Sequence, residues 1–238
     1  MNDISQKQYA IDSVVAVIVQ KHGKDAAIGV VADVTQSHEV QAMVEATVQK
    51  LGSLTVMVAN AGISKVKSVL ELTETDIRET MDINFMGVFH CYQVAAKQMI
   101  AQGPRNKSES GYKIIGAASI MAFKAQPLST HYTASKWAVR GMTHVFALEL
   151  AKHSITVNAY APGIVGTPMW KSIREGLEER NVMDKETSLE EYASSINAMG
   201  RLGTPEDVAN VVGGFLAGPD AAYLTGQTIV IDGGIVFT

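Results

Sequence analysis

Apolar residues follow two alternating patterns along the chain, and the alternation predicts the fold class. Apolar positions three or four apart, as on one face of a helix, recur at residues 5–22, 37–51, 74–102 and 129–152. Short strand-like runs lie between and after them, at residues 27–33, 54–59, 112–118, 155–160 and 228–231. Strands that alternate with helices are typical of a parallel sheet covered by helices on both faces. We therefore predict an α/β fold.

The first segment, residues 5–22, is compatible with two structures. Apolar residues from Ile11 to Ile18 share one helical face, and Gly23 can end a helix. Residues 14–19 are also an apolar run rich in β-branched side chains, which suits a strand. We favour the helix and leave the strand as the alternative.

Composition and charge narrow the class of protein. Hydrophobic residues make up 47% of the chain and charged residues 18%, which excludes a disordered or fibrous protein. The net charge of −4 gives no basic excess, so we expect neither nucleic acid nor a membrane as partner. No repeat or linker divides the sequence, and residues 1–238 are predicted to form one domain.

Cysteine and histidine usage adds two expectations. The only cysteine, Cys91, cannot form an internal disulfide, and we expect a reducing, cytoplasmic location and a buried side chain. The six histidines show no metal-ligand spacing with acidic residues, so no metal site is expected. His131 adjoins a tyrosine singled out below, and a packed or surface position is favoured for it over a role in a pocket.

The sharpest chemical feature is a tyrosine and a lysine four residues apart, Tyr132 and Lys136. On a helix this spacing puts the phenol and the ammonium side by side. A nearby cation stabilises phenolate and lowers the tyrosine pKa, which suits a proton shuttle to a hydroxyl or carbonyl oxygen. Taken alone, the pair is more often a packed tyrosine and a solvated lysine.

Residues at predicted strand ends strengthen the case for a site. Ser119 follows one strand, Asn60-Ala61-Gly62 follows the preceding one, and residues 162–167 follow the next. In parallel α/β sheets, sites form outside the carboxyl ends of the strands. We therefore expect Ser119 and Tyr132 to contact the same substrate oxygen.

These pieces occur in a family-specific order. The order is Asp33-Val34 after a strand, Asn60-Ala61-Gly62, Asn84, Ser119, Tyr132 with Lys136, and Pro162-Gly163 through Thr167. In this series the chain resembles the classical short-chain dehydrogenases/reductases from about residue 32 to its end. The resemblance implies a Rossmann-like, doubly wound parallel sheet and a nicotinamide cofactor, NAD or NADP.

The resemblance also implies a catalytic set of Asn84, Ser119, Tyr132 and Lys136. Tyr132 would be the general acid and base, and Lys136 would lower its pKa and hold the nicotinamide ribose. Ser119 would orient the substrate carbonyl, and Asn84 would hold a helix irregularity and a water that feeds protons to Lys136. Strand-end or helix capping is the alternative role for Asn60 and Asn84.

A larger set of residues would line the cofactor. Asp33 and Val34 would face the adenine, and Ile164 and Thr167 would position the nicotinamide carboxamide. The full set implied by the resemblance is Asp33, Val34, Asn60, Ala61, Gly62, Tyr132, Lys136, Pro162, Gly163, Ile164, Val165 and Thr167.

One branch of the family is especially similar. Residues 157–167, followed by Met169 and Trp170, look like the acetoin/diacetyl reductases, which implies a small carbonyl or alcohol substrate such as a ketone, diketone or polyol. NAD is slightly favoured on this ground. A polar insertion at about residues 168–198 would be a substrate lid, in which Met169 and Trp170 contact the substrate or simply pack. Two long helices of the kind that pair in this family imply a homodimer or homotetramer.

The resemblance fails at the start of the sequence. The family's first strand and glycine-rich turn, Thr-Gly-x-x-x-Gly-x-Gly, are absent, and so is its second strand. Such a turn places backbone N–H groups on the cofactor pyrophosphate, so we expect much weaker binding. Without the central first strand, the sheet would contain a gap, or the strand at residues 27–33 would pair with a new neighbour, for which residues 14–19 are a candidate.

Three functional hypotheses follow. The first is an oxidoreductase with a weakened or remodelled dinucleotide site, which the complete tyrosine, lysine, serine and asparagine set favours. The second is a non-dehydrogenase of the same fold, either a binding or regulatory protein or an enzyme that does not use nicotinamide. The third is a truncated, inactive form of a full-length reductase.

Overall fold

A four-stranded parallel sheet lies at the centre of the computed structural model, which describes residues 2–3, 8–105 and 111–238. Its strands, hydrogen-bonded in this order, are β3 (Val56–Ala59), β4 (Tyr112–Ala117), β5 (Ile155–Pro162) and β6 (Thr228–Ile231). In the register, Met57 lies opposite Ile114, and Ile114 lies opposite Val157. The predicted α/β fold with a parallel sheet is confirmed.

A separate two-stranded sheet pairs β1 (Asn2–Asp3) with β2 (Val30–Val31) in parallel. The strand predicted at residues 27–33 is therefore only two residues long. The expectation that both strands preceding it would be absent is wrong in one respect, because β1 is present. Two polar residues have no hydrophobic period, so no pattern could reveal β1. Within the described residues β2 pairs with β1 and not with β3.

Helix α1 (Gln8–His22) decides the ambiguous segment in favour of a helix. Residues 5–7 of the predicted helix lie outside the described residues, and residues 14–19 are helical, so the alternative strand is wrong. Ile11 is the buried residue of α1. A Cβ on Gly29 would lie 2.5 Å from the Ile11 side chain, so α1 packs closely on the segment that leads into β2.

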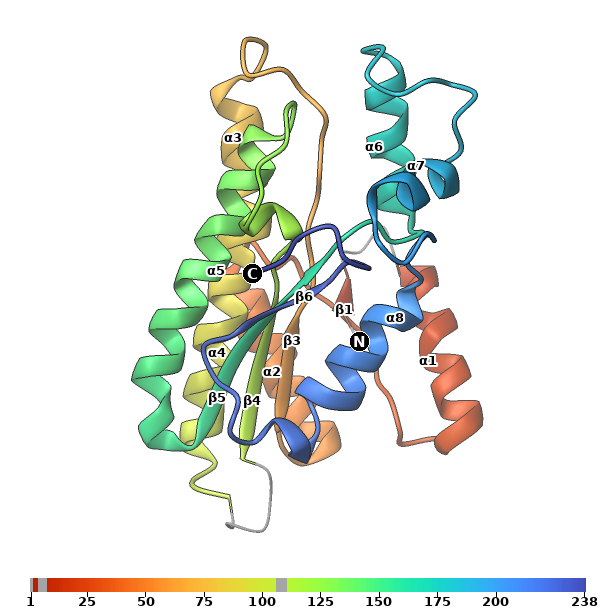
Figure 1. The fold of residues 1–238 in the computed structure, drawn as a ribbon. Helices are drawn as coiled ribbons and strands as arrows, with labels where there is room; N and C mark the ends of the chain where they lie inside the picture. Colours follow the sequence, from red (N-terminus) through yellow and green to blue (C-terminus); the bar gives the residue numbers. More distant parts are fainter. Residues whose placement is uncertain (1, 4–7, 106–110) are drawn as a thin grey trace.

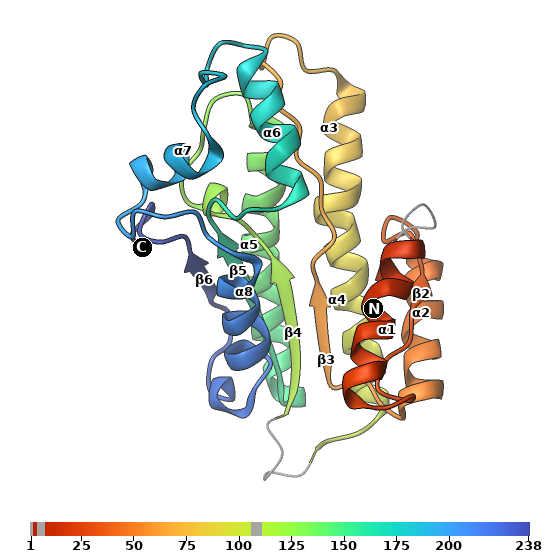
Figure 2. The same ribbon diagram turned by 90° about the vertical axis from the view of Figure 1, so that its right-hand side faces the viewer.

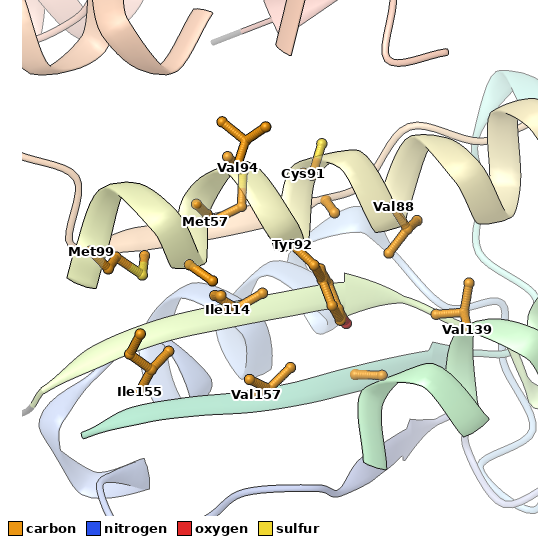
Figure 3. Packing of buried hydrophobic residues seen from close by; sticks show 14 of the residues in the cluster. Met57, Val88, Cys91, Tyr92, Val94, Met99, Ile114, Val139, Ile155 and Val157 are labelled. Carbon is orange, nitrogen blue, oxygen red and sulfur yellow. The ribbon is translucent and has the colours of Figure 1, made fainter. Parts of the chain in front are cut away.

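Helices cover both faces of the sheet (Figure 1, Figure 2). On one face lie α4 (Gly87–Ala101) and α5 (Thr130–Leu150), with α2 (Ser37–Leu51) packed against α4. On the other face lies α8 (Pro205–Ala209) with its π-helical continuation Asn210–Leu216. The larger core fills the first face, and Figure 3 shows Tyr92 and Cys91 of α4 within it. The predicted burial of Cys91 is confirmed.

The long helix predicted at residues 74–102 is continuous but irregular. It begins at α3 (Glu74–Met81), where Thr73 and Asp76 form a capping box. A π-helical segment, Asp82–Met86, then leads into α4. The π turn contains Asn84, at the place where the resemblance implied an irregularity.

The polar insertion after β5 contains two helices, α6 (Pro168–Glu178) and α7 (Leu189–Ile196). Both lie beyond the carboxyl ends of the strands (Figure 1). Across the described part of the chain, none of the helices has the length and apolar character that a bilayer crossing requires.

Candidate active site

Helix α5 brings Tyr132 and Lys136 together, as their spacing predicts. The helix starts after Ser129, so both residues lie in its first two turns. The Lys136 Nζ atom lies 5.5 Å from the centroid of the Tyr132 ring. The ammonium also donates a 2.7 Å hydrogen bond to the Ala117 carbonyl at the end of β4. Lys136 is buried, so its charge is held at a fixed position beside the phenol.

Ser119 follows β4 and meets the same phenol. Its Oγ atom accepts a 3.2 Å hydrogen bond from the Met121 backbone N–H and so caps the short turn Ile120–Ala122. The Ser119 side chain is also near enough to the Tyr132 phenol to lower its pKa. The two hydroxyl groups therefore converge, and one substrate oxygen can contact both.

Asn84 links the π turn to the loop after β3 and to α5. Its Oδ1 atom accepts a 2.8 Å hydrogen bond from the Ile63 N–H, and its Nδ2 group donates a 2.9 Å bond to the Ile63 carbonyl. The same Nδ2 group donates to Ser135 Oγ at 3.1 Å. Asn84 and Ser135 are fully buried. This network fixes the loop after β3 relative to the helix that carries Tyr132.

Gly62 lies close to Asn84 and Lys136. A Cβ at this position would lie 3.2 Å from Asn84 Oδ1 and 3.7 Å from Lys136 Nζ, so any other residue would crowd these two side chains. An ammonium has three N–H donors, and one of them is hydrogen-bonded to the Ala117 carbonyl. The remaining two can bind neighbouring hydroxyl groups, which fits the ribose of a nicotinamide nucleotide.

The pKa values of the pair differ from the simple expectation. Burial raises the pKa of Tyr132, although the nearby Ser119 side chain acts in the opposite direction. Burial also lowers the pKa of Lys136 to about 8. The overall pKa of Tyr132 is thus raised rather than lowered, with desolvation by burial as the largest cause. Tyr132 holds its proton and can act as an acid.

Asn60 is tied to β5 rather than left free at the strand end. Its Oδ1 atom accepts a 2.5 Å hydrogen bond from the hydroxyl of Tyr160, which lies 100 residues later in the sequence. Tyr160 is buried, and burial raises its pKa. The bond connects the ends of β3 and β5 across β4 at the edge of the sheet where Ser119 lies.

Residues 162–167 form the opposite side of the site. Val165 pairs with Gly203, and the Gly203 N–H donates to the Ile164 carbonyl at 3.1 Å. A Cβ on Gly163 would lie 2.7 Å from the Asp232 Cβ, so this turn packs against the segment after β6. Thr167 precedes α6 and makes no capping hydrogen bond with its side chain.

The remaining predicted residues follow β2 or lie at the start of α6. The Asp33 carboxylate accepts a 2.9 Å hydrogen bond from the Thr35 N–H, and Val34 is buried against α4. Thr35 also lines an open groove with Arg78 of α3. Met169 and Trp170 are half-buried in the first turn of α6. Among the described residues no His, Cys, Asp or Glu cluster could hold a metal ion.

Comparison with known proteins shows which family has this arrangement. The sequence model of a family described as enoyl-(acyl carrier protein) reductase matches residues 2–236. A short-chain dehydrogenase/reductase from Armillaria gallica is 43% identical over 237 residues, which make up 100% of this chain and 85% of that protein. The chain belongs to the short-chain dehydrogenase/reductase family.

Other members of the short-chain dehydrogenase/reductase family agree in sequence and in fold. An L-2,3-butanediol dehydrogenase from Corynebacterium glutamicum is 38% identical over 235 residues, 99% of this chain and 87% of that protein. The crystal structure of levodione reductase is similar with a TM-score of 0.86 and 27% identity, covering 98% of this chain and 85% of that one. The chain is thus an oxidoreductase, and its homologues generally use NAD or NADP.

Sequence reasoning missed two residues of this short-chain dehydrogenase/reductase site. Ser135 was visible only as part of the motif around Tyr132, and nothing predicted its bond to Asn84. Tyr160 was predicted to lie in a strand, but no local pattern indicates a bond to Asn60. Both contacts join segments far apart in the sequence, so only the folded structure reveals them.

Proposed function

We propose that this enzyme reduces a small ketone or diketone with NADH or NADPH, or oxidises the matching secondary alcohol. The observation that carries the proposal is the convergence of Ser119, Tyr132 and Lys136 from two different elements. The Tyr132 phenol lies beside the Lys136 ammonium and near enough to Ser119 for that side chain to lower its pKa. A proton donor, a second hydroxyl and a cation are what a carbonyl oxygen needs as negative charge develops on it.

The substrate class rests on sequence similarity and on the residues near the site. The butanediol dehydrogenase that is 38% identical takes a small diol by its name. Met169 and Trp170, at the start of α6, can give apolar contacts to a short carbon chain. We propose acetoin, diacetyl or a similar compound as the substrate, with both side chains in contact with it.

The chain offers good contacts for the nicotinamide end of the cofactor. The lack of a side chain at Gly62 and the two remaining N–H donors of Lys136 suit the ribose hydroxyls. Asn60, Ala61 and residues 162–167 lie at the same edge, and the proposal includes them as cofactor contacts. When bound, the cofactor supplies or accepts the hydride. NAD is slightly favoured over NADP from the resemblance to acetoin/diacetyl reductases.

The protein residues would divide the proton chemistry among them. In the direction of reduction, Tyr132 donates its phenolic proton to the carbonyl oxygen, and the Ser119 hydroxyl donates a hydrogen bond to that oxygen. With a pKa of about 8, Lys136 is protonated by about ten to one at pH 7. Its charge stabilises the phenolate that remains. Asn84 keeps the loop after β3 in place through Ile63.

The adenosine end would be held less firmly. Asp33 and Val34 lie at the edge near the groove beside Thr35, and we propose that they contact the adenine. We propose that most of the affinity comes from the nicotinamide nucleotide, because Gly62 and Lys136 lie at that end of the site.

Titration with cofactor fragments tests this division. Calorimetry would compare NADH, NADPH and reduced nicotinamide mononucleotide, and diacetyl and acetoin would then be screened for turnover. The proposal expects the mononucleotide to bind within about tenfold of NADH, because few contacts to the remaining half are lost. The matched control is Lys136→Met, which removes the ribose donors and should weaken both ligands equally. Failure of the folded protein to bind any of the three at millimolar concentration would refute the proposal.

Assembly and location complete the proposal. Val145 and Leu148 of α5 are 52% and 82% exposed, which supports pairing of this helix in a homodimer or homotetramer. Light scattering of the wild type and of Leu148→Glu tests this. A monomeric mass for the wild type would contradict it. The single buried cysteine, Cys91, suits a cytoplasmic location.

A further inference from the structure

One face of helix α6, mostly apolar, lies toward the loop after β3. Met169, Ile173, Gly176 and Arg180 recur at helical spacing, so they lie on one face of the helix and its extension. Gly176 shows where this face points, because its nearest neighbour across the gap is Val66 of that loop.

The backbone at Gly176 lies so close to Val66 that no residue with a side chain fits there without a shift of one segment. A Cβ on Gly176 would lie 2.8 Å from the Val66 Cβ and 3.2 Å and 3.5 Å from its two methyl carbons. Val66 is short and β-branched, so it cannot swing away as a long side chain would. Glycine weakens a helix interior, and close approach of another segment is the usual reason to find it there.

A polar contact lies at the end of the same helix. The Arg180 guanidinium donates to the Gly176 carbonyl at 3.3 Å and pairs with Glu71 at 3.4 Å. Glu71 belongs to the same loop as Val66. The ion pair is partly exposed and therefore weak, so the packing of Gly176 on Val66 is the main contact that sets the distance between helix and loop.

The two contacts join elements on either side of the site. The strand order is β3-β4-β5, the loop with Val66 follows β3, and α6 follows β5. Ser119 follows β4, between them. Figure 2 shows α6 beside the chain segment that connects β3 with α3. The loop and the helix therefore meet across the edge of the sheet that carries Ser119.

We propose that the contact of Gly176 with Val66 sets the size of the substrate that the enzyme accepts. It fixes how closely α6, with Met169 and Ile173 on the same face, approaches the loop after β3. A larger residue at either position holds the two segments apart and makes room for a bulkier ligand. The inference rests on the proposed function, because it assigns the size limit to the proposed carbonyl site.

The experiment compares kcat/KM for diacetyl with that for a phenyl-substituted diketone. In Gly176→Ala, kcat/KM for the phenyl diketone divided by kcat/KM for diacetyl should rise by about tenfold. One or two carbon atoms give discrimination of this size in an apolar pocket. Adding Val66→Ala removes the atoms with which the new methyl collides and should restore the wild-type ratio. Val66→Ala alone should lower the ratio, and it keeps the test valid if Gly176→Ala does not fold.

Gly213→Ala is the matched control, because a Cβ there meets no atom within 4 Å. Hydrogen exchange of the α6 amides gives a readout that does not depend on turnover. Exchange should be faster in Gly176→Ala and return to the wild-type rate in the double variant. An unchanged substrate ratio, or a ratio that Val66→Ala does not restore, would overturn the inference.

Failure of the proposed function would be recognised separately. If the wild type turns over no diketone while the exchange rates still couple Gly176 to Val66, the carbonyl function is wrong and the contact stands. The size limit is then read from calorimetry, as the ratio of affinities for the two diketones. An equal ratio in the wild type and Gly176→Ala would overturn the inference in that case also.

Discussion

Replacing Asn84 by alanine should destabilise the protein and loosen the site at the same time. The asparagine makes three hydrogen bonds, two with the backbone of Ile63 and one with Ser135. Alanine would leave the N–H and carbonyl of Ile63 without these partners. Each buried polar group that loses its partner costs about 1–3 kcal/mol. Ile63 is half-buried, so water can satisfy it in part, and we estimate a total loss of about 3 kcal/mol.

Urea denaturation measures this loss. With a slope of about 3 kcal/mol per molar, the midpoint of Asn84→Ala should fall by about 1 M relative to the wild type. The exposed Asn210→Ala is the control and should stay within about 0.5 kcal/mol. A midpoint shift for Asn84→Ala no larger than that of the control would refute the hydrogen-bond argument. A normal midpoint with unchanged cofactor affinity would also remove Asn84 from the proposed site.

Other variants test separate parts of the structure. Burial lowers the pKa of His131 from 6.5, so its contribution to stability is fully present above about pH 6.5 and is lost as the pH falls. The melting temperature of His131→Phe minus that of the wild type should therefore be larger at about pH 5 than at about pH 8. A difference that does not change with pH would contradict this. Gly116→Ala should cost about 1–3 kcal/mol in urea, because its methyl would collide with the Tyr92 phenol, and Tyr92→Phe should recover part of the loss. Tyr160→Phe breaks the hydrogen bond to Asn60 and should raise the KM for the cofactor by a larger factor than it lowers kcat. A larger effect on kcat than on KM would show that this bond does not position the loop after β3 for the cofactor.

Local patterns predicted the elements whose cause is local. The helix at residues 37–51 was predicted at its observed bounds, because a periodic apolar face runs along it, and Gly52 follows its last residue in the structure. Thr73 and Thr204 precede helices and both form capping boxes with the aspartate three residues later, which is also a local cause. The alternation of strands and helices likewise gave the parallel sheet.

Features that depend on distant segments could not be predicted. The strand β1 consists of two polar residues and exists only through pairing with β2. The bond between Tyr160 and Asn60 and the contact between Gly176 and Val66 also join distant segments. The overall direction of the Tyr132 pKa shift could not be predicted either, because spacing reveals a neighbouring charge but not the degree of burial.

The most direct test of the account is the rate of diacetyl reduction by Tyr132→Phe. The variant keeps the ring and loses only the hydroxyl that meets Ser119. The consumption of NADH would be followed in the wild type and in the variant, with NADH affinity measured on both. The account predicts that kcat falls by about 10²–10⁴ while NADH affinity is unchanged, because general acid catalysis contributes a factor of that size. A variant that reduces diacetyl at the wild-type rate would show that Tyr132 is not the proton donor, and the proposed mechanism would be wrong.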